Sequence, residues 1–145
     1  MGIGMRVARW LSVAVVCAGS LLAMLPAGAA VASAKGCTGR NGPGAVNSTC
    51  ITVQGSGLHV DSVEVAMNST SPGGPVQLCE VGADLTGTLA DHQPFHRHGQ
   101  SRCSKVGHAY VEFPVNLDLA PQSLLCATTT FEGRTASPAC EKIEP

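Results

Sequence analysis

The chain has 145 residues, of which 13% are charged and 3% aromatic, and its formal net charge is −1 at pH 7. Without residues 1–34, which are expected to be removed as a signal peptide, 111 residues remain (145 − 34), enough for one domain and not for two. The near-neutral charge excludes the strongly basic surface that is typical of nucleic-acid binding. Beyond the N-terminal region, no apolar segment is long enough to span a membrane. We therefore expect a monomeric, single-domain protein that binds neither nucleic acid nor membrane.

Residues 1–34 have the pattern of a cleavable signal peptide. Two arginines precede an almost wholly apolar run at residues 10–25, and small residues follow this run. The run is short for a membrane span but suits a signal sequence. Ala32-Ser33-Ala34 matches the A-x-A cleavage pattern, and Ala27-Gly28-Ala29 offers an earlier site. We expect cleavage after Ala34, so that residues 35–145 form a single secreted, extracellular β domain.

Removal of residues 1–34 would leave an even number of cysteines, which in a small exported chain indicates a disulfide framework. The alternative, a metal–thiolate site, has no C-x-x-C pair to support it. Sequential pairing is predicted, because each neighbouring pair brackets a turn-rich or polar segment. The expected disulfides are Cys37–Cys50, Cys79–Cys103 and Cys126–Cys140.

Apolar residues beyond residue 34 alternate with a period of two, and Gly and Pro recur, so strands are predicted and no amphipathic helix. At Asp61-Ser62 the alternation changes phase, which predicts a β-bulge. The run at 107–119 contains Pro114, which cannot donate a hydrogen bond to a neighbouring strand. This predicts either an edge strand or, as the preferred interpretation, two strands separated by a bend. The expected strands, in chain order, are 50–53, 58–67, 76–81, 107–119 (whole or split), 124–131 and 139–143.

Turn signals separate these runs. They are Gly55-Ser56-Gly57, residues 71–75, Pro121-Gln122 and Glu132-Gly133. Six to seven short antiparallel strands at such spacing are typical of an all-β domain. We expect a small, disulfide-stabilised immunoglobulin-like β-sandwich, with a small barrel as the alternative.

The segment from 82 to 105 shows no strand pattern and is expected to be a long loop, which is often functional or disordered. It contains three of the five histidines of the chain. Neutral imidazoles bind copper and zinc, and a nearby carboxylate can ligate the ion or orient a ligand. The candidate metal site is His92, His96 and His98, with Asp91 beside them. The alternative interpretation is a solvated polar loop.

A second hypothesis for this region is a cationic binding surface formed by Arg97, Arg102, Lys105 and His108. Histidines protonate below about pH 6, which would give this segment of an otherwise acidic chain a positive face. Such a face would dock an anionic surface, for example an acidic glycan or a cell-wall polymer. Ordinary surface charge is the alternative.

The sequence contains no G-x-S-x-G, H-E-x-x-H or P-loop motif, so catalysis receives no support. We expect a secreted, non-catalytic binding module without a cofactor, whose partner is an extracellular protein or a glycan surface. One alternative is an extracellular copper- or zinc-binding protein that uses the histidine segment. Another is a small protease inhibitor that presents residues 79–103, with Arg97 or Arg102 as specificity residue. Sequons at Asn47 and Asn68 are interpreted as turn residues.

Overall fold

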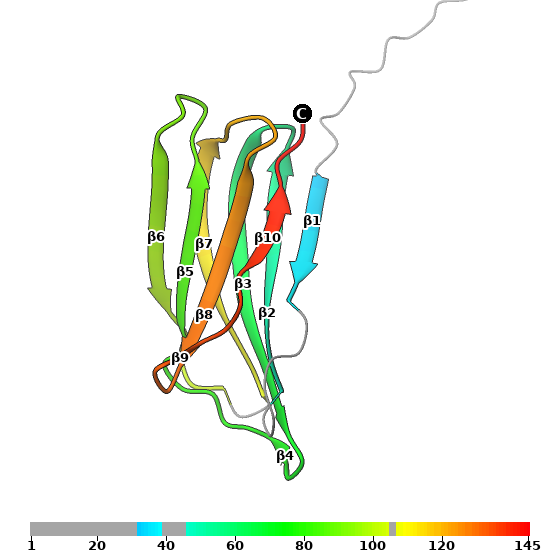
Figure 1. The fold of residues 1–145 in the computed structure, drawn as a ribbon, viewed down its shortest axis with the longest axis vertical. Helices are drawn as coiled ribbons and strands as arrows, with labels where there is room; N and C mark the ends of the chain where they lie inside the picture. Colours follow the sequence, from blue (N-terminus) through cyan, green and yellow to red (C-terminus); the bar gives the residue numbers. More distant parts are fainter. Residues whose placement is uncertain (1–31, 39–45, 105–106) are drawn as a thin grey trace, which may run out of the picture.

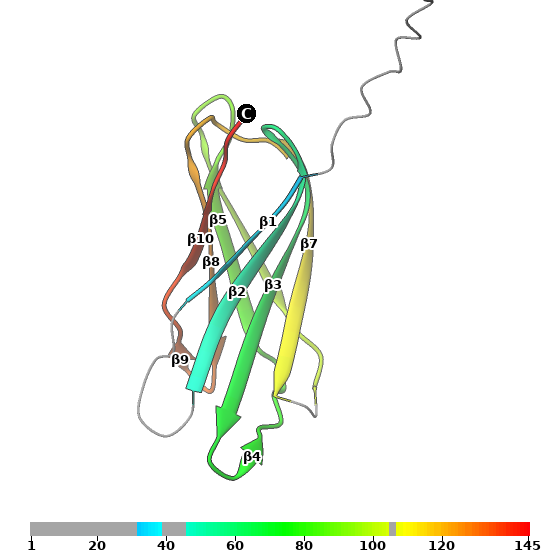
Figure 2. The same ribbon diagram turned by 90° about the vertical axis from the view of Figure 1, so that its right-hand side faces the viewer.

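The computed structural model describes residues 32–38, 46–104 and 107–145, which form ten β-strands and no helix. None of these residues belongs to a helix long and apolar enough to cross a membrane. The strands form two antiparallel sheets that pack face to face, and Figure 2 shows the two layers side by side. The prediction of an all-β sandwich is therefore confirmed.

Each sheet contains five strands. The first sheet has the order β1-β2-β3-β7, with the short β4 pairing the end of β3, and the second has the order β10-β8-β5-β6, with the short β9 pairing the end of β8 (Figure 1). The strands are β1 (Ala32–Cys37), β2 (Val46–Ser56), β3 (His59–Ser71), β4 (Gly74–Pro75), β5 (Gly82–Thr88), β6 (Pro94–Gln100), β7 (His108–Asp118), β8 (Leu124–Phe131), β9 (Arg134–Thr135) and β10 (Ala139–Lys142).

The order of the strands is that of an immunoglobulin-like sandwich. Strands β2, β3 and β7 take the places of A, B and E, and β5, β8 and β10 take those of C, F and G, whereas strand D has no counterpart among the described strands. Strand β6 is an added edge beside β5, and β1 is an added edge beside β2. The disulfides of this domain differ from the disulfide of antibody domains, which joins the two sheets. Two of the disulfides here join neighbouring strands within one sheet.

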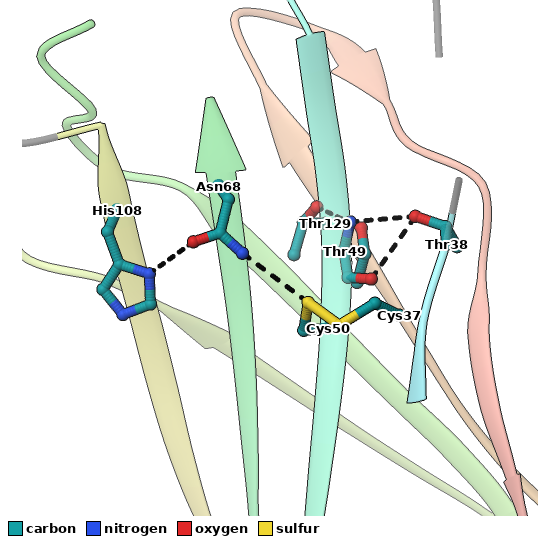
Figure 3. Close-up of a disulfide and its surroundings, with 7 residues drawn as sticks. All are labelled: Cys37, Thr38, Thr49, Cys50, Asn68, His108 and Thr129. Atoms are coloured by element: carbon teal, nitrogen blue, oxygen red, sulfur yellow. Dashed lines mark hydrogen bonds between the residues drawn. A yellow bond between two sulfur atoms is a disulfide. The ribbon is translucent and has the colours of Figure 1, made fainter. Parts of the chain in front are cut away.

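The core lies between the sheets, where the apolar residues of the period-two pattern meet. Val63, Val65 and Phe113 of the first sheet belong to the same buried cluster as Leu85 and Leu125 of the second. Within this interior, the hydroxyls of Thr49 and Thr129 are 2.6 Å apart and join the two sheets by a buried hydrogen bond (Figure 3). This bond satisfies two polar groups that would be costly to bury alone.

The predicted β-bulge at Asp61 is confirmed. The pairing of β2 with β3 passes from Gln54 opposite Ser62 to Gly55 opposite Val60, which leaves Asp61 without an opposite residue. The bulge changes the parity of β3, so Val60 and Val63 are both buried although they are three residues apart.

The preferred interpretation of Pro114, two strands split by a bend, is wrong. Strand β7 is continuous and, among the described strands, pairs only with β3, so the alternative of an edge strand holds. Ser69 donates its N–H to the carbonyl of Gly107 (2.8 Å). In an antiparallel ladder, residues bonded to the partner alternate with residues whose backbone groups point away. In this part of β7, the backbone N–H and C=O groups of the odd-numbered residues therefore point toward β3. Those of the even-numbered residues point to the open side of the strand, where Pro114 lacks its N–H.

The segment 82–105 is not a long loop, because β5 and β6 form a hairpin there. Ala83 and Leu85 of β5 are completely buried. Two alternating apolar residues are too few to be recognised in the sequence as the pattern of a strand. Strand β6 lies at the edge of its sheet, and its side chains are exposed or half-buried on both faces. A strand of this kind has no hydrophobic period for the sequence to display.

Three smaller expectations also differ from the structure. Residues 76–81 contribute only an isolated bridge between Leu78 and Ser104. The two sequon asparagines lie in paired strands and not in turns, Asn47 in β2 and Asn68 in β3. Strand β1 was not expected, because its first three residues belong to the predicted signal peptide. The expected strand at 76–81 is absent, and β1, the β5–β6 hairpin and the two-residue strands β4 and β9 are additional, which explains why ten strands are present instead of six to seven.

The predicted sequential disulfides are confirmed: Cys37–Cys50, Cys79–Cys103 and Cys126–Cys140. The first and third join directly opposite residues of neighbouring strands, with Cα atoms 4.0 Å apart, and each fastens an edge strand to its sheet. Under the loop-entropy model, crosslinks that close loops of this size contribute roughly 3 kcal/mol each. Three intramolecular disulfides indicate an oxidising environment of the extracellular type.

Candidate functional site: a groove along the free edge of β7

A groove of about 680 Å³ runs beside strand β7. It is lined by two uninterrupted segments, residues 100–104 on one side and residues 108–112 of β7 on the other. Because consecutive residues line it, the groove follows the backbone edge of the strand and not one face of the sheet. Its volume is within the range of about 300–1,000 Å³ that is common for ligand sites.

On the β7 side, the groove is bordered by backbone groups that have no partner among the described residues. The even-numbered residues in this part of β7 point their backbone N–H and C=O groups away from β3, because bonded and non-bonded residues alternate in an antiparallel pair. These residues are His108, Tyr110 and Glu112. None of them forms a backbone hydrogen bond on the open side with another described residue. The groove therefore presents unpaired backbone donors and acceptors at a regular spacing.

The opposite side of the groove is held firmly. Ser104 exchanges two backbone hydrogen bonds with Leu78 (2.7 and 2.9 Å), and the N–H of Ser101 donates to the same neighbouring segment (2.9 Å). The Cys79–Cys103 disulfide crosslinks these two segments, and Cys103 itself lines the groove. The crosslink and these hydrogen bonds restrain residues 100–104 before any ligand arrives, which lowers the entropic cost of ordering this wall on binding.

His108 is oriented by a chain of contacts that ends at a disulfide (Figure 3). Its Nδ1 lies 2.7 Å from Oδ1 of Asn68, and the Asn68 amide nitrogen donates to Sγ of Cys50 (3.6 Å). Because an amide oxygen only accepts, Nδ1 of His108 carries the donated proton. The ring centroid of Tyr110 is 6.1 Å from that of His108. The chain thus fixes one edge of the imidazole and leaves Nε2 for a ligand.

Two of the side chains that line the groove, Tyr110 and Arg102, are of types that dominate the binding energy of protein interfaces. Tyr110 is 56% exposed although it is a large aromatic residue, and Arg102 is exposed on the opposite wall. Tyrosine and arginine are enriched among the residues that carry most of the binding energy at interfaces. A tyrosine ring supplies apolar area and its hydroxyl a hydrogen-bonding group. The groove can therefore bind a chain that offers both backbone and side-chain contacts.

The structure brings together two of the four residues predicted to form a cationic surface. Arg102 and His108 both line the groove, but Arg97 lies within β6 and does not. Lys105 lies outside the described residues. Tyr110 and Glu112, which also line the groove, were not predicted as site residues. Pro114 was the available signal for them, because a proline within a strong strand pattern indicates a free edge.

The predicted metal residues are arranged differently from the expectation. His96 Nε2 and His98 Nδ1 lie 2.9 and 3.0 Å from the same carboxylate oxygen of Asp84, on the neighbouring strand β5. The hydrogen bond from His98 is the main cause that lowers the pKa of Asp84 below its ordinary value. His92 lies in the turn between β5 and β6 with a positive φ of 65°, and Asp91 accepts a hydrogen bond from the N–H of Gln93 there.

Among the described residues, no group of three or more His, Cys, Asp or Glu side chains is arranged to hold a metal ion. Asp84, which the sequence did not single out, is thus the carboxylate that accompanies two of the three histidines, and Asp91 is not. Strand pairing decides this, since Asp84 is directly opposite His98. Copper or zinc binding by this segment stays a prediction.

A separate histidine lies at the far end of β7. His59 Nδ1 is 2.7 Å from Oδ1 of Asp118, and its Nε2 is 3.2 Å from Oδ1 of Asn116. The hydrogen bond to Asp118 is the largest cause that raises the pKa of His59 above its ordinary value of 6.5. This pair is exposed and does not line the β7 groove.

Comparison of the chain with protein-family models, with curated proteins and with solved structures found no match. The class of the protein therefore follows from its own fold. It is a small immunoglobulin-like β-sandwich with three disulfides and a groove beside one edge strand.

Proposed function

We propose that this chain is an exported, non-catalytic binding module that recognises an extracellular protein through the β7 groove. The observation that carries the proposal is the combination of an unpaired strand edge with exposed Tyr110, Arg102 and His108 in one groove. Export is supported by the signal-like pattern of residues 1–34 and by the three disulfides.

A protein ligand fits this groove better than a glycan or a small molecule. The unpaired N–H and C=O groups of β7 are spaced for another polypeptide backbone, and only a second backbone can satisfy them in series. A glycan would contact Tyr110 and Arg102, but most of the unpaired N–H and C=O groups of β7 would remain hydrogen-bonded to water. The groove is also lined by five consecutive residues on each side, as expected for a site that takes a segment of chain.

Selection from a phage library of random linear peptides tests the proposal. Peptides enriched on the disulfide-bonded protein are measured against the groove variant, Arg102→Ala with Tyr110→Ser. The matched control is Arg134→Ala with Leu124→Ser, because Leu124 is 57% exposed, as Tyr110 is 56% exposed, and neither control residue lines the groove. We expect the groove variant to lose at least about tenfold in affinity, equivalent to about 1.4 kcal/mol, and the control to lose none. Equal binding to the wild type and both variants would contradict the proposal.

A further inference from the structure

We infer that the β7 groove takes an extended segment of its partner as an added antiparallel strand, hydrogen-bonded to residues 108–112. This inference rests on the proposed function and names how the ligand is held. Its basis is the backbone of β7: His108, Tyr110 and Glu112 each offer one N–H and one C=O on the side that lines the groove. Strand addition satisfies all of these groups at once.

The ladder has a defined end. Pro114 is the next residue that faces the open side, and it has no N–H to offer. An added strand can therefore form its backbone hydrogen bonds with residues 108–112, and at residue 114 the next donor is missing. A proline at this place also protects an otherwise continuous edge from unspecific pairing with other strands.

The occupant is a single segment of chain and not a second copy of this domain. The groove has a second wall, residues 100–104, which the Cys79–Cys103 disulfide and the bonds to Leu78 hold in place. A second copy would have to bring an entire sheet edge, with its own wall, into a space of about 680 Å³. One extended segment of five residues, about 16 Å long, needs only the space beside β7.

The charges on the outer face of β7 favour one direction of the added strand and one pattern of side chains along it. Glu112 is directly opposite Glu64 of β3, which places two like charges side by side. A basic side chain in the added strand opposite Glu112 relieves this repulsion. At the other end, an acidic side chain opposite His108 accepts a charge-assisted hydrogen bond from Nε2 in the imidazolium form, in which Nδ1 still donates to Asn68 and both ring nitrogens are donors. An aromatic residue between them lies opposite Tyr110, where aromatic cross-strand pairs are favourable.

The probe is an acetylated and amidated peptide, Ser-Lys-Thr-Tyr-Val-Asp-Ser, labelled for fluorescence anisotropy with the disulfide-bonded protein. Antiparallel alignment puts its Lys opposite Glu112, its Tyr opposite Tyr110 and its Asp opposite His108. N-methylation of the Tyr amide removes a donor that faces β7, whereas N-methylation of the neighbouring Val amide removes one that faces away. We expect the first change to weaken binding at least tenfold and the second by less than threefold.

A peptide with Lys and Asp exchanged is the control for direction and should bind at least fivefold more weakly. Equal effects of the two N-methylations, stronger binding of the exchanged peptide, or no binding of the parent peptide would each overturn the inference. None of these results overturns the proposed function, which is decided by the dependence of the selected peptides on Arg102 and Tyr110. The modifications are made in the ligand, so no result depends on whether a variant of the protein folds.

Discussion

Leu85 tests whether the segment without a visible hydrophobic pattern is part of the core. Its side chain is completely buried within the cluster that joins the two sheets. Replacement by Ala removes the equivalent of three methylene groups, which at ~0.8 kcal/mol each is roughly 2.4 kcal/mol of transfer free energy. Incomplete collapse of the cavity adds to this loss. We expect Leu85→Ala to lower the free energy of unfolding by about 3 kcal/mol.

Urea denaturation of the disulfide-bonded protein measures this change. With a slope of about 2 kcal/mol per molar urea, the midpoint should fall by about 1.5 M. Thr86→Val is the matched control, because residue 86 is the next residue of β5 and is exposed, so its change should remain within about 0.5 kcal/mol. A loss below about 1 kcal/mol for Leu85→Ala, or equal losses for both variants, would refute the assignment of residue 85 to the core.

Three further predictions concern the surface and the first strand. Asp118→Asn should lower the pKa of His59 toward its ordinary value of 6.5, because Asp118 is the main group that raises it; an NMR titration that finds an unchanged pKa would contradict this. Asp84→Asn should remove stability that is present above the ordinary pKa of 3.8 and lost as the pH falls through the lower pKa of folded Asp84. Because the Asp84 side chain is 35% exposed, the free energy of unfolding should fall by less than about 1 kcal/mol at pH 7. The difference between Asp84→Asn and the wild type should vanish in acid, and a difference that persists there would refute the argument. Protein cleaved after residue 29 keeps all of β1, whereas cleavage after Ala34 removes three of its six residues. The longer form should therefore be more stable to urea, and equal midpoints would mean that this pairing contributes nothing.

Sequence reasoning succeeded where burial is one-sided. Strands β3 and β8 carry the period-two pattern, and even the bulge at Asp61 was visible as a change of phase. The disulfides were predictable for a related reason. Each cysteine pair brackets a single connection or hairpin, so residues close in sequence are also close in space.

Sequence reasoning failed where the surroundings of a strand decide its appearance. Strand β6 has no hydrophobic face, because its side chains on both faces of the sheet are exposed or half-buried. The grouping of His96 and His98 with Asp84 depends on the register of β5 against β6, which no local pattern contains. The β7 groove is a feature of the backbone and of topology. Arg102 and His108 were predicted for their charge, whereas Tyr110 and Glu112 were missed because the split-strand interpretation of Pro114 was preferred to that of a free edge.

Residue-resolved hydrogen–deuterium exchange shows whether the free edge of β7 is the binding surface. In the free protein, the amides of His108, Tyr110 and Glu112 should exchange fast, while those of Ala109 and Val111, bonded to β3, should exchange slowly. Addition of a peptide selected on the wild-type protein should slow exchange at the three even-numbered residues. Slow exchange at these amides in the free protein, or protection by the peptide only elsewhere, would contradict the account.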